Sequence, residues 1–203
     1  NRTMTYSVDS NGVGEYGTPG ANWEGNKTSQ DITVTYVYDS TNGKLLSAAG
    51  AGTMWSADSF GSVTKGNITQ TYTIIKGQAK MTANRTQTYS VSTTGAGSYA
   101  NPGSNVEGNM SKQDITVTYV YNQTTGQLVS AAGVGTMSSS DEFGNVTKGD
   151  ITQTYTIMKG QAKMTENRTK TYSVSSAGVG SYGDPGANWE GNKSSQDMTV
   201  SYV

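Results

Sequence analysis

The chain has 203 residues, a formal net charge of −1 at pH 7 and 33% hydrophobic residues. It contains no cysteine and no histidine, which excludes disulfides, thiolate chemistry, nucleophiles with a histidine base and the usual zinc ligands. The near-neutral charge gives no reason to expect a nucleic-acid partner. No apolar run approaches the ~18 residues that a membrane-spanning helix needs, so we expect no membrane span.

One line of sequence recurs through the chain at a fixed distance. The segments NRTMTYSV, NRTQTYSV and NRTKTYSV begin at Asn1, Asn84 and Asn167, so the period is 83 residues (84 − 1 = 83 and 167 − 84 = 83). Residues 1–83 and 84–166 are identical at 57 positions, and residues 167–203 repeat the start of the pattern. The sequence therefore predicts two complete β repeats, 1–83 and 84–166, and a partial third repeat, 167–203, with an arbitrary phase.

In chain order, NRTMTYSV and its copies are followed in each repeat by a glycine-rich segment, and strand patterns come after it. The segment 12–26 contains Pro19-Gly20 and reads as turns and loop. The stretch DITVTYVYD at 31–39 alternates Ile32, Val34 and Tyr36 with threonines, which is the period of a half-buried strand. The Asn-Gly pair within 40–44 then predicts a hairpin turn.

The second half of the repeat carries two further patterns. Residues 45–55 (LLSAAGAGTMW) have small side chains at successive positions, which indicates either close approach of another sheet or backbone, or a weak or bulged strand. Residues 67–91 alternate with a slip at Ile74-Ile75, and Gly77 marks a bulge or break, so two or three strands are expected there.

These patterns predict an all-β, mainly antiparallel fold with about five or six strands in each 83-residue repeat. The sequence leaves open whether the repeats form separate sandwich-like units or one continuous stack of sheets. Low charge and the absence of proline in the TQTYTI and ITVTYVY segments are typical of strands that pair edge to edge, as in amyloid-like assemblies.

Recurring carboxylates and a glycine-rich loop imitate catalytic and binding motifs. Some carboxylates recur at the same position of each repeat: Glu24, Glu107 and Glu190; Asp31, Asp114 and Asp197; and Asp58 and Asp141. They could serve acid/base catalysis or bind a cation, or they could be charges at strand ends that prevent the strands from pairing out of register. GANWEGNKT at 20–28 resembles a phosphate-binding loop, but Asn26 interrupts the motif and a strand follows it. We therefore expect a non-enzyme with no metal and no cofactor.

Asn-x-Ser/Thr sequences recur nine times in the chain. Two families keep the repeat register and are the candidate N-glycosylation sites: Asn1, Asn84 and Asn167, and Asn26, Asn109 and Asn192. In the second family Thr28 becomes Ser111 and Ser194, so the acceptor hydroxyl survives substitution. The abundance of Asn, Ser and Thr also produces such sequences by chance.

Aromatic residues in the glycine-rich loops suggest a further role. Aromatic rings at these positions offer surfaces on which sugars can stack. The residues are Tyr16, Trp23, Tyr99, Tyr182 and Trp189, and Val106 replaces the tryptophan in the second repeat. Most other Tyr and Thr residues fall on strands, where cross-strand pairs contribute about 0.2–1 kcal/mol each and a structural role is expected.

The DITVTYVY and TQTYTI strands and the Asn-x-Ser/Thr sequences, in an array without Cys or His, resemble the proteins that build cell-surface tubes in archaea. The resemblance is to the tubular sheath proteins, in particular the major sheath protein of filamentous methanogens. It rests on composition and repeat style along the whole chain, and it implies a secreted, amyloid-like β assembly that encloses chains of cells.

The sequence thus leads to a structural hypothesis. We expect an extracellular, cell-surface protein that partners with itself as a homo-polymer and carries covalent glycans, forming a sheath, fibre or surface layer through strand or sheet pairing. The alternatives are the repeat stalk of a cell-surface adhesin and a carbohydrate-binding module.

Overall fold

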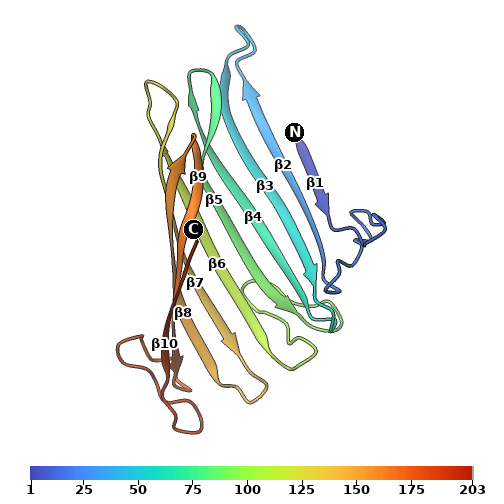
Figure 1. Ribbon diagram of the computed structural model, residues 1–203, viewed down its shortest axis with the longest axis vertical. Helices are drawn as coiled ribbons and strands as arrows, with labels where there is room; N and C mark the ends of the chain where they lie inside the picture. The colour runs from blue at the N-terminus through green and yellow to red at the C-terminus, as the bar shows by residue number, and fades with distance from the viewer. Residues whose placement is uncertain (203) are drawn as a thin grey trace.

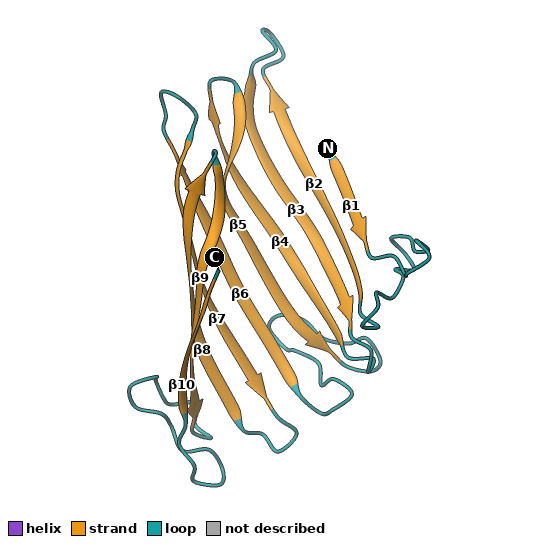
Figure 2. Cartoon of the chain, in the orientation of Figure 1, coloured by secondary structure: helices purple, strands orange, loops and turns teal. Residues whose placement is uncertain are grey.

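The computed structural model describes residues 1–202, which form one antiparallel sheet of ten strands without any helix (Figures 1 and 2). Each strand pairs with its neighbours in the sequence, so the spatial order runs from β1 to β10. The prediction of an all-β, antiparallel fold is confirmed. The strands are β1 (Arg2–Tyr6), β2 (Lys27–Tyr38), β3 (Leu45–Ala57), β4 (Val63–Ile75), β5 (Gln78–Val91), β6 (Met110–Tyr121), β7 (Leu128–Ser140), β8 (Val146–Met158), β9 (Gln161–Val174) and β10 (Ser195–Ser201).

The strand boundaries follow the sequence period. β2 starts at Lys27 and β6 starts 83 residues later at Met110, and the same offset relates β3 to β7, β4 to β8 and β5 to β9. The repeat therefore contributes four strands, fewer than the five or six expected, because its strands are long: twelve to fourteen residues in β2–β9. The boundary between residues 83 and 84 falls inside β5, so the repeats share strands and no linker separates them.

Two kinds of tight turn connect the strands within a repeat. The Asn-Gly segment 39–44 joins β2 to β3 as expected, with the Asp39 carboxylate accepting hydrogen bonds from the backbone N–H groups of Thr41 (2.8 Å) and Asn42 (3.2 Å). Between β4 and β5 the chain turns in two residues, Lys76 and Gly77, both with positive φ (52° and 75°). These angles are those of a type I′ turn, whose twist suits a hairpin. Gly77 therefore marks a turn that divides residues 67–91 between β4 and β5.

One face of the sheet carries small and apolar side chains. We call it the glycine face; its central residues are Ala48, Gly50, Ile68, Gln70 and Tyr72. Glycine is favoured at position 50, because a Cβ atom there would lie 2.9 Å from the Cβ of Gln70 and 2.6 Å from its Oε1 atom. That oxygen accepts a hydrogen bond from the Tyr72 hydroxyl at 2.8 Å. The small residues of 45–55 thus admit side chains from neighbouring strands of the same sheet. β3 pairs on both sides, with one register shift against β2 at Leu46, so the expected bulge is also present.

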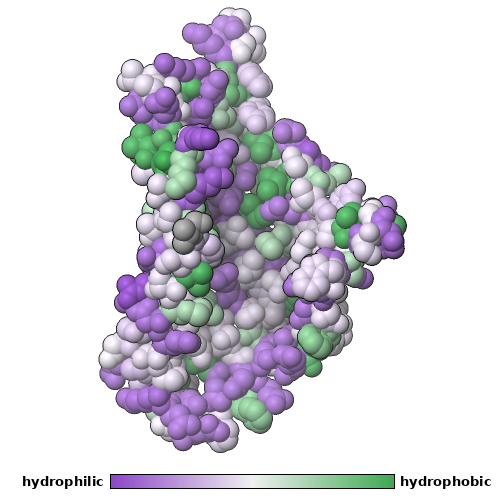
Figure 3. Space-filling view, in the orientation of Figure 1, coloured by the Kyte–Doolittle hydropathy of each residue, from purple (hydrophilic) through white to green (hydrophobic). Residues whose placement is uncertain are grey.

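The sheet curls, and the face shown in Figure 3 is hollowed along its middle. Ala48, Gly50 and Ile68 are buried although residues 1–202 provide no second sheet to cover them, which indicates that the glycine face lies inside the curl. The accessible surface is 12034 Å². A compact 21.3 kDa monomer would expose roughly 9,100 Å². The excess of about a third reflects a single, incompletely covered layer.

Three long loops lie at one end of the strands, after β1, β5 and β9 (Figure 1). Each is attached to its strand by a serine. In the middle loop the Ser90 hydroxyl donates to the Gly103 carbonyl at 2.7 Å and accepts from the Ser111 backbone N–H at 2.9 Å. The loops therefore hold defined positions over the sheet. Within the described part of the chain, no helix is long and apolar enough to span a membrane.

Candidate functional site

The two edges of the sheet are the first candidate site, because each repeats a strand that is paired on both sides inside the sheet. β1 corresponds to β5 and β9, and β10 corresponds to β2 and β6. β1 pairs only with β2, and β10 pairs only with β9; the two edges do not pair with each other. Each edge therefore lacks a neighbour that its interior copies possess.

At the β1 edge the missing neighbour leaves an apolar side chain exposed. Val91 pairs with Val63 of β4, and Val91 and its copy Val174 are each only 2% exposed. Val8, the equivalent residue after β1, is 43% exposed. The sequence is the same in all three places, so the difference comes from the absence of a β4-type strand beside β1.

The C-terminal edge shows the same contrast between a buried interior residue and its exposed copy. Ile75, at the end of β4, is 3% exposed, because the turn after β6 lies against it; a Cβ on Gly126 would sit 3.8 Å from the Ile75 side chain. Met158, the equivalent residue of β8, is 52% exposed. A further β2–β3 type hairpin would cover Met158 as the β6–β7 hairpin covers Ile75.

The backbone of β1 also points unpaired groups outward. The Val34 N–H donates to the Asn1 carbonyl (2.7 Å) and the Ser7 N–H donates to the Thr28 carbonyl (2.9 Å). Hydrogen bonding alternates along an antiparallel strand, so Thr3 and Thr5 face β2 with their backbone groups, whereas the N–H of Met4 points to the free edge. This edge has no proline and no bulge to prevent pairing.

The recurring aspartates of β2, β6 and β10 form cross-strand ion pairs. Arg2 donates to both carboxylate oxygens of Asp31, with Nη2 to Oδ2 at 2.6 Å, and Arg85 does the same to Asp114 at 2.5 Å. Arg168 pairs with Asp197 at the third position. The arginine hydrogen bonds lower the pKa of Asp114 below its ordinary value of 3.8. These aspartates therefore hold strand register, and sequence reasoning missed their arginine partners.

The recurring glutamates contact the glycosylation candidates beside them. The Asn26 amide donates to Glu24 at 3.2 Å, and the same contact recurs between Asn109 and Glu107 and between Asn192 and Glu190. No group of three or more carboxylates placed to hold a metal ion occurs among residues 1–202.

A row of cationic and aromatic side chains crosses the opposite face of the sheet. We call it the lysine–tyrosine row; directly opposed register positions on β3–β9 place its members, in order, at Trp55, Lys65, Tyr89, Lys112, Ser138, Lys148 and Tyr172. Side chains at opposed positions lie on the same face, so the row is continuous. It was not predicted from the sequence, because it depends on the register of six strand pairs.

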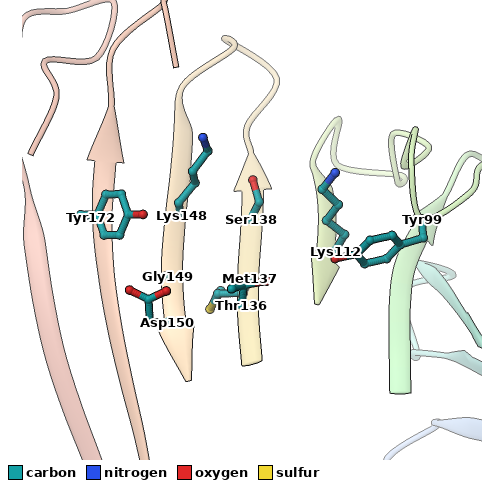
Figure 4. Close-up of a pocket in the computed structure, with 9 residues that line it drawn as sticks. All are labelled: Tyr99, Lys112, Thr136, Met137, Ser138, Lys148, Gly149, Asp150 and Tyr172. Atoms are coloured by element: carbon teal, nitrogen blue, oxygen red, sulfur yellow. The ribbon is translucent and has the colours of Figure 1, made fainter. Parts of the chain in front are cut away.

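Two grooves open along this row, and the eight positions that line the first recur in the second displaced by 83 residues. The second has Ser138 in place of Trp55, and Lys112 lines only the second. The first, of about 270 Å³, lies between Tyr16 of the loop and Tyr89, with Lys65 between them. The second, of about 200 Å³, lies between Tyr99 and Tyr172, with Lys148 in the corresponding place. Figure 4 shows the second groove, with Lys112, Ser138, Lys148 and Tyr172 on four neighbouring strands.

The loop tyrosines contact lysines of the sheet. The Lys112 ammonium lies 5.3 Å from the centre of the Tyr99 ring, and that of Lys170 lies 4.8 Å from the Tyr182 ring. Both separations suit a cation–π interaction. The other predicted sugar-stacking rings behave differently: Trp23 and Trp189 project into solvent. The structure therefore brings Tyr16 and Tyr99, and not the loop tryptophans, to the lysine–tyrosine row, while Tyr182 contacts Lys170 beside it.

The two families of glycosylation candidates occupy different places. Asn26, Asn109 and Asn192 lie at the end of the long loops, next to β2, β6 and β10. Asn84 and Asn167 lie inside β5 and β9, with their Oδ1 atoms buried, whereas Asn1 lies next to the exposed strand β1. The loop family lies outside the strands, and its side-chain amides donate to the neighbouring glutamates.

Comparison with known proteins gives no match: no family model, no curated protein and no solved structure is similar to this chain.

Proposed function

We propose that this chain is a structural, self-assembling extracellular protein that builds a sheath, fibre or surface layer by β-strand pairing between copies, and that it performs no catalysis. The observation that carries the proposal is that successive repeats join by strand pairing into one open sheet. The exposure at the two edges shows what a further repeat would cover. Val8 and Met158 are exposed where their interior copies Val91 and Ile75 are buried. Each edge thus has an apolar residue and a row of backbone groups that a further repeat would cover.

The interior of the sheet supplies the template for that addition. β4 pairs with β5 along residues 63–75, and the residues of β1 repeat those of β5 that take part in this pairing. A β4-type strand from a neighbouring repeat would therefore find beside β1 the partner that β4 finds in β5. The neighbouring repeat can belong to the same polypeptide or to a second copy, and the proposal concerns the second copy.

The low net charge favours such association, since a charge of −1 provides little repulsion between copies. The resemblance to archaeal tubular sheath proteins is a separate reason to propose a surface tube. A cell-surface adhesin stalk is the alternative, which the open repeat array also suits; a stalk would remain monomeric at high concentration.

The edge can be blocked without disturbing the fold. Met4→Pro removes an N–H that points away from β2, so the β1–β2 ladder keeps its hydrogen bonds. Met4→Ala is the matched control, because it removes the same side chain and keeps the N–H. Sedimentation velocity over a concentration series should show the parent chain and Met4→Ala assembling and Met4→Pro remaining monomeric.

Two results would count against the proposal. If the parent chain stays monomeric at every concentration, self-assembly is wrong and the adhesin stalk becomes the better account. If Met4→Pro assembles as well as Met4→Ala, the β1 edge is not the assembly surface. Circular dichroism of both variants checks that the sheet is intact.

A further inference from the structure

The two grooves of the lysine–tyrosine row are a repeated feature that strand pairing does not use. Each has a tyrosine from a long loop on one side, a tyrosine from β5 or β9 on the other, and a lysine from β4 or β8 between them. Thr53 in the first groove corresponds to Thr136 in the second. The groove is therefore a property of the repeat, present wherever a loop and the following four strands are complete.

The lysines of the row have no anionic partner in the protein. Within residues 1–202, Lys65, Lys112 and Lys148 form no ion pair. The Lys65 and Lys148 ammonium groups reach only a loop carbonyl, at 3.4 Å in each case. Asp114 on the same face is paired with Arg85, whereas Asp150 lines the second groove together with Lys148. The first groove therefore presents the half-buried Lys65 without a carboxylate among its lining residues, and the second presents Lys112 and Lys148 with one.

The tyrosines and the lysine of each groove indicate the class of ligand that it could bind. Tyrosine rings offer flat apolar faces with a negative potential, which suit the C–H face of a sugar ring, and each ring also carries a hydroxyl. The lysine between the rings supplies a charge-assisted donor for a carboxylate. We propose that the lysine–tyrosine row binds an anionic polysaccharide of the uronic acid type, with one sugar-binding subsite in each groove.

The spacing of the grooves favours a polymer over a single sugar. Equivalent grooves are four strands apart, which is about 19 Å at 4.8 Å per strand. A chain long enough to occupy both grooves gains avidity, because the second contact is intramolecular. Affinity should therefore rise steeply once the oligosaccharide spans both grooves.

Nucleic acid, the other polyanion that stacks on aromatic rings, suits the chain less well. Nucleic-acid binding draws its affinity from many phosphate contacts, and the row offers only three lysines, whereas a uronic acid carries one carboxylate on each sugar ring. Asp150 lines the second groove where Asn67 lines the first, so the first groove suits either anion better.

The test measures binding of polygalacturonate oligomers of graded length to the full chain by isothermal titration calorimetry. Lys65→Ala/Lys148→Ala removes the central lysine from both grooves. The matched control, Lys44→Ala/Lys163→Ala, changes the net charge equally, and both of its lysines are exposed at the opposite end of the strands. The groove variant should bind roughly tenfold or more weakly, and the control should bind like the parent.

Neutral polygalactose and an oligothymidylate of similar length serve as comparison ligands. The proposal is supported if polygalactose and oligothymidylate both bind more weakly than polygalacturonate. Absence of polygalacturonate binding, equal loss in both lysine variants, or tighter binding of the oligothymidylate would overturn it. Sedimentation velocity on the same samples reports whether the copies associate, so binding and assembly are measured separately. The polysaccharide proposal can therefore fail while the assembly proposal holds, and the reverse.

Discussion

The same valine substitution, made at an interior and at an edge position of the repeat, should have opposite consequences for folding and for assembly. Val91 is 2% exposed and Val8 is 43% exposed, although both follow the same Tyr-Ser pair. Valine to alanine removes two carbons, worth about 0.8 kcal/mol each when buried, and the remaining cavity raises the cost to about 2 kcal/mol. Val91→Ala should therefore lower the free energy of unfolding by about 2 kcal/mol.

Val8→Ala should lower the free energy of unfolding by about half as much, because about two-fifths of that residue already faces solvent in the single chain. Assembly would bury Val8 as Val91 is buried, and the two carbons that alanine lacks would account for roughly 0.7 kcal/mol of the contact. Each added copy would lose that contribution in Val8→Ala, so the critical concentration for assembly should rise about threefold.

Urea denaturation of dilute, monomeric samples measures the first effect, and light scattering against concentration measures the second. The reasoning would be refuted if Val8→Ala destabilised the monomer as much as Val91→Ala does. It would also be refuted if Val8→Ala left the critical concentration unchanged, since the residue would then lie outside the contact between copies.

Three further outcomes follow from the structure. The pKa of Asp114 is lowered by hydrogen bonds from the arginine on the neighbouring strand. The contribution of Asp114 to stability is therefore present above about pH 4 and is lost as the pH falls through the folded-state pKa. The urea midpoint should fall less between pH 5 and pH 3 in Asp114→Asn than in the parent. Gly133→Ala places a Cβ 2.9 Å from the Cβ of Gln153 and should cost about 1–3 kcal/mol in thermal unfolding, with an unchanged melting temperature arguing against the close contact. Mass spectrometry of the native protein should find sugar on Asn109 in the loop and not on Asn84 within β5, and the reverse pattern would contradict the accessibility argument.

The repeat and the strands could be predicted because local pattern determines them. The alternation of Ile32, Val34 and Tyr36 predicts β2, and the following Asn-Gly predicts its hairpin. The number of strands was overestimated because strand length depends on pairing across the sheet, which no local pattern reports. The break at Gly77 was predicted, but its two-residue turn was not, since a lysine with positive φ is not a usual turn signal.

The candidate sites required tertiary information. Trp55, Lys65 and Tyr89 are far apart in the sequence, and only the register of β3, β4 and β5 places them side by side. The Arg85–Asp114 pair has the same origin, since its members are separated by a long loop. The loop tyrosines were identified from the sequence because they recur in glycine-rich segments, but their contacts with lysines depend on how the loops fold back over the sheet.

The most direct test of the account is electron microscopy combined with fibre diffraction of the concentrated protein. If copies add through the edges of the sheet, the strands run across the long axis of the assembly. Ordered filaments, tubes or layers should then give a meridional reflection near 4.7 Å. Dispersed particles at every concentration, or ordered assemblies without that reflection, would contradict assembly by strand pairing.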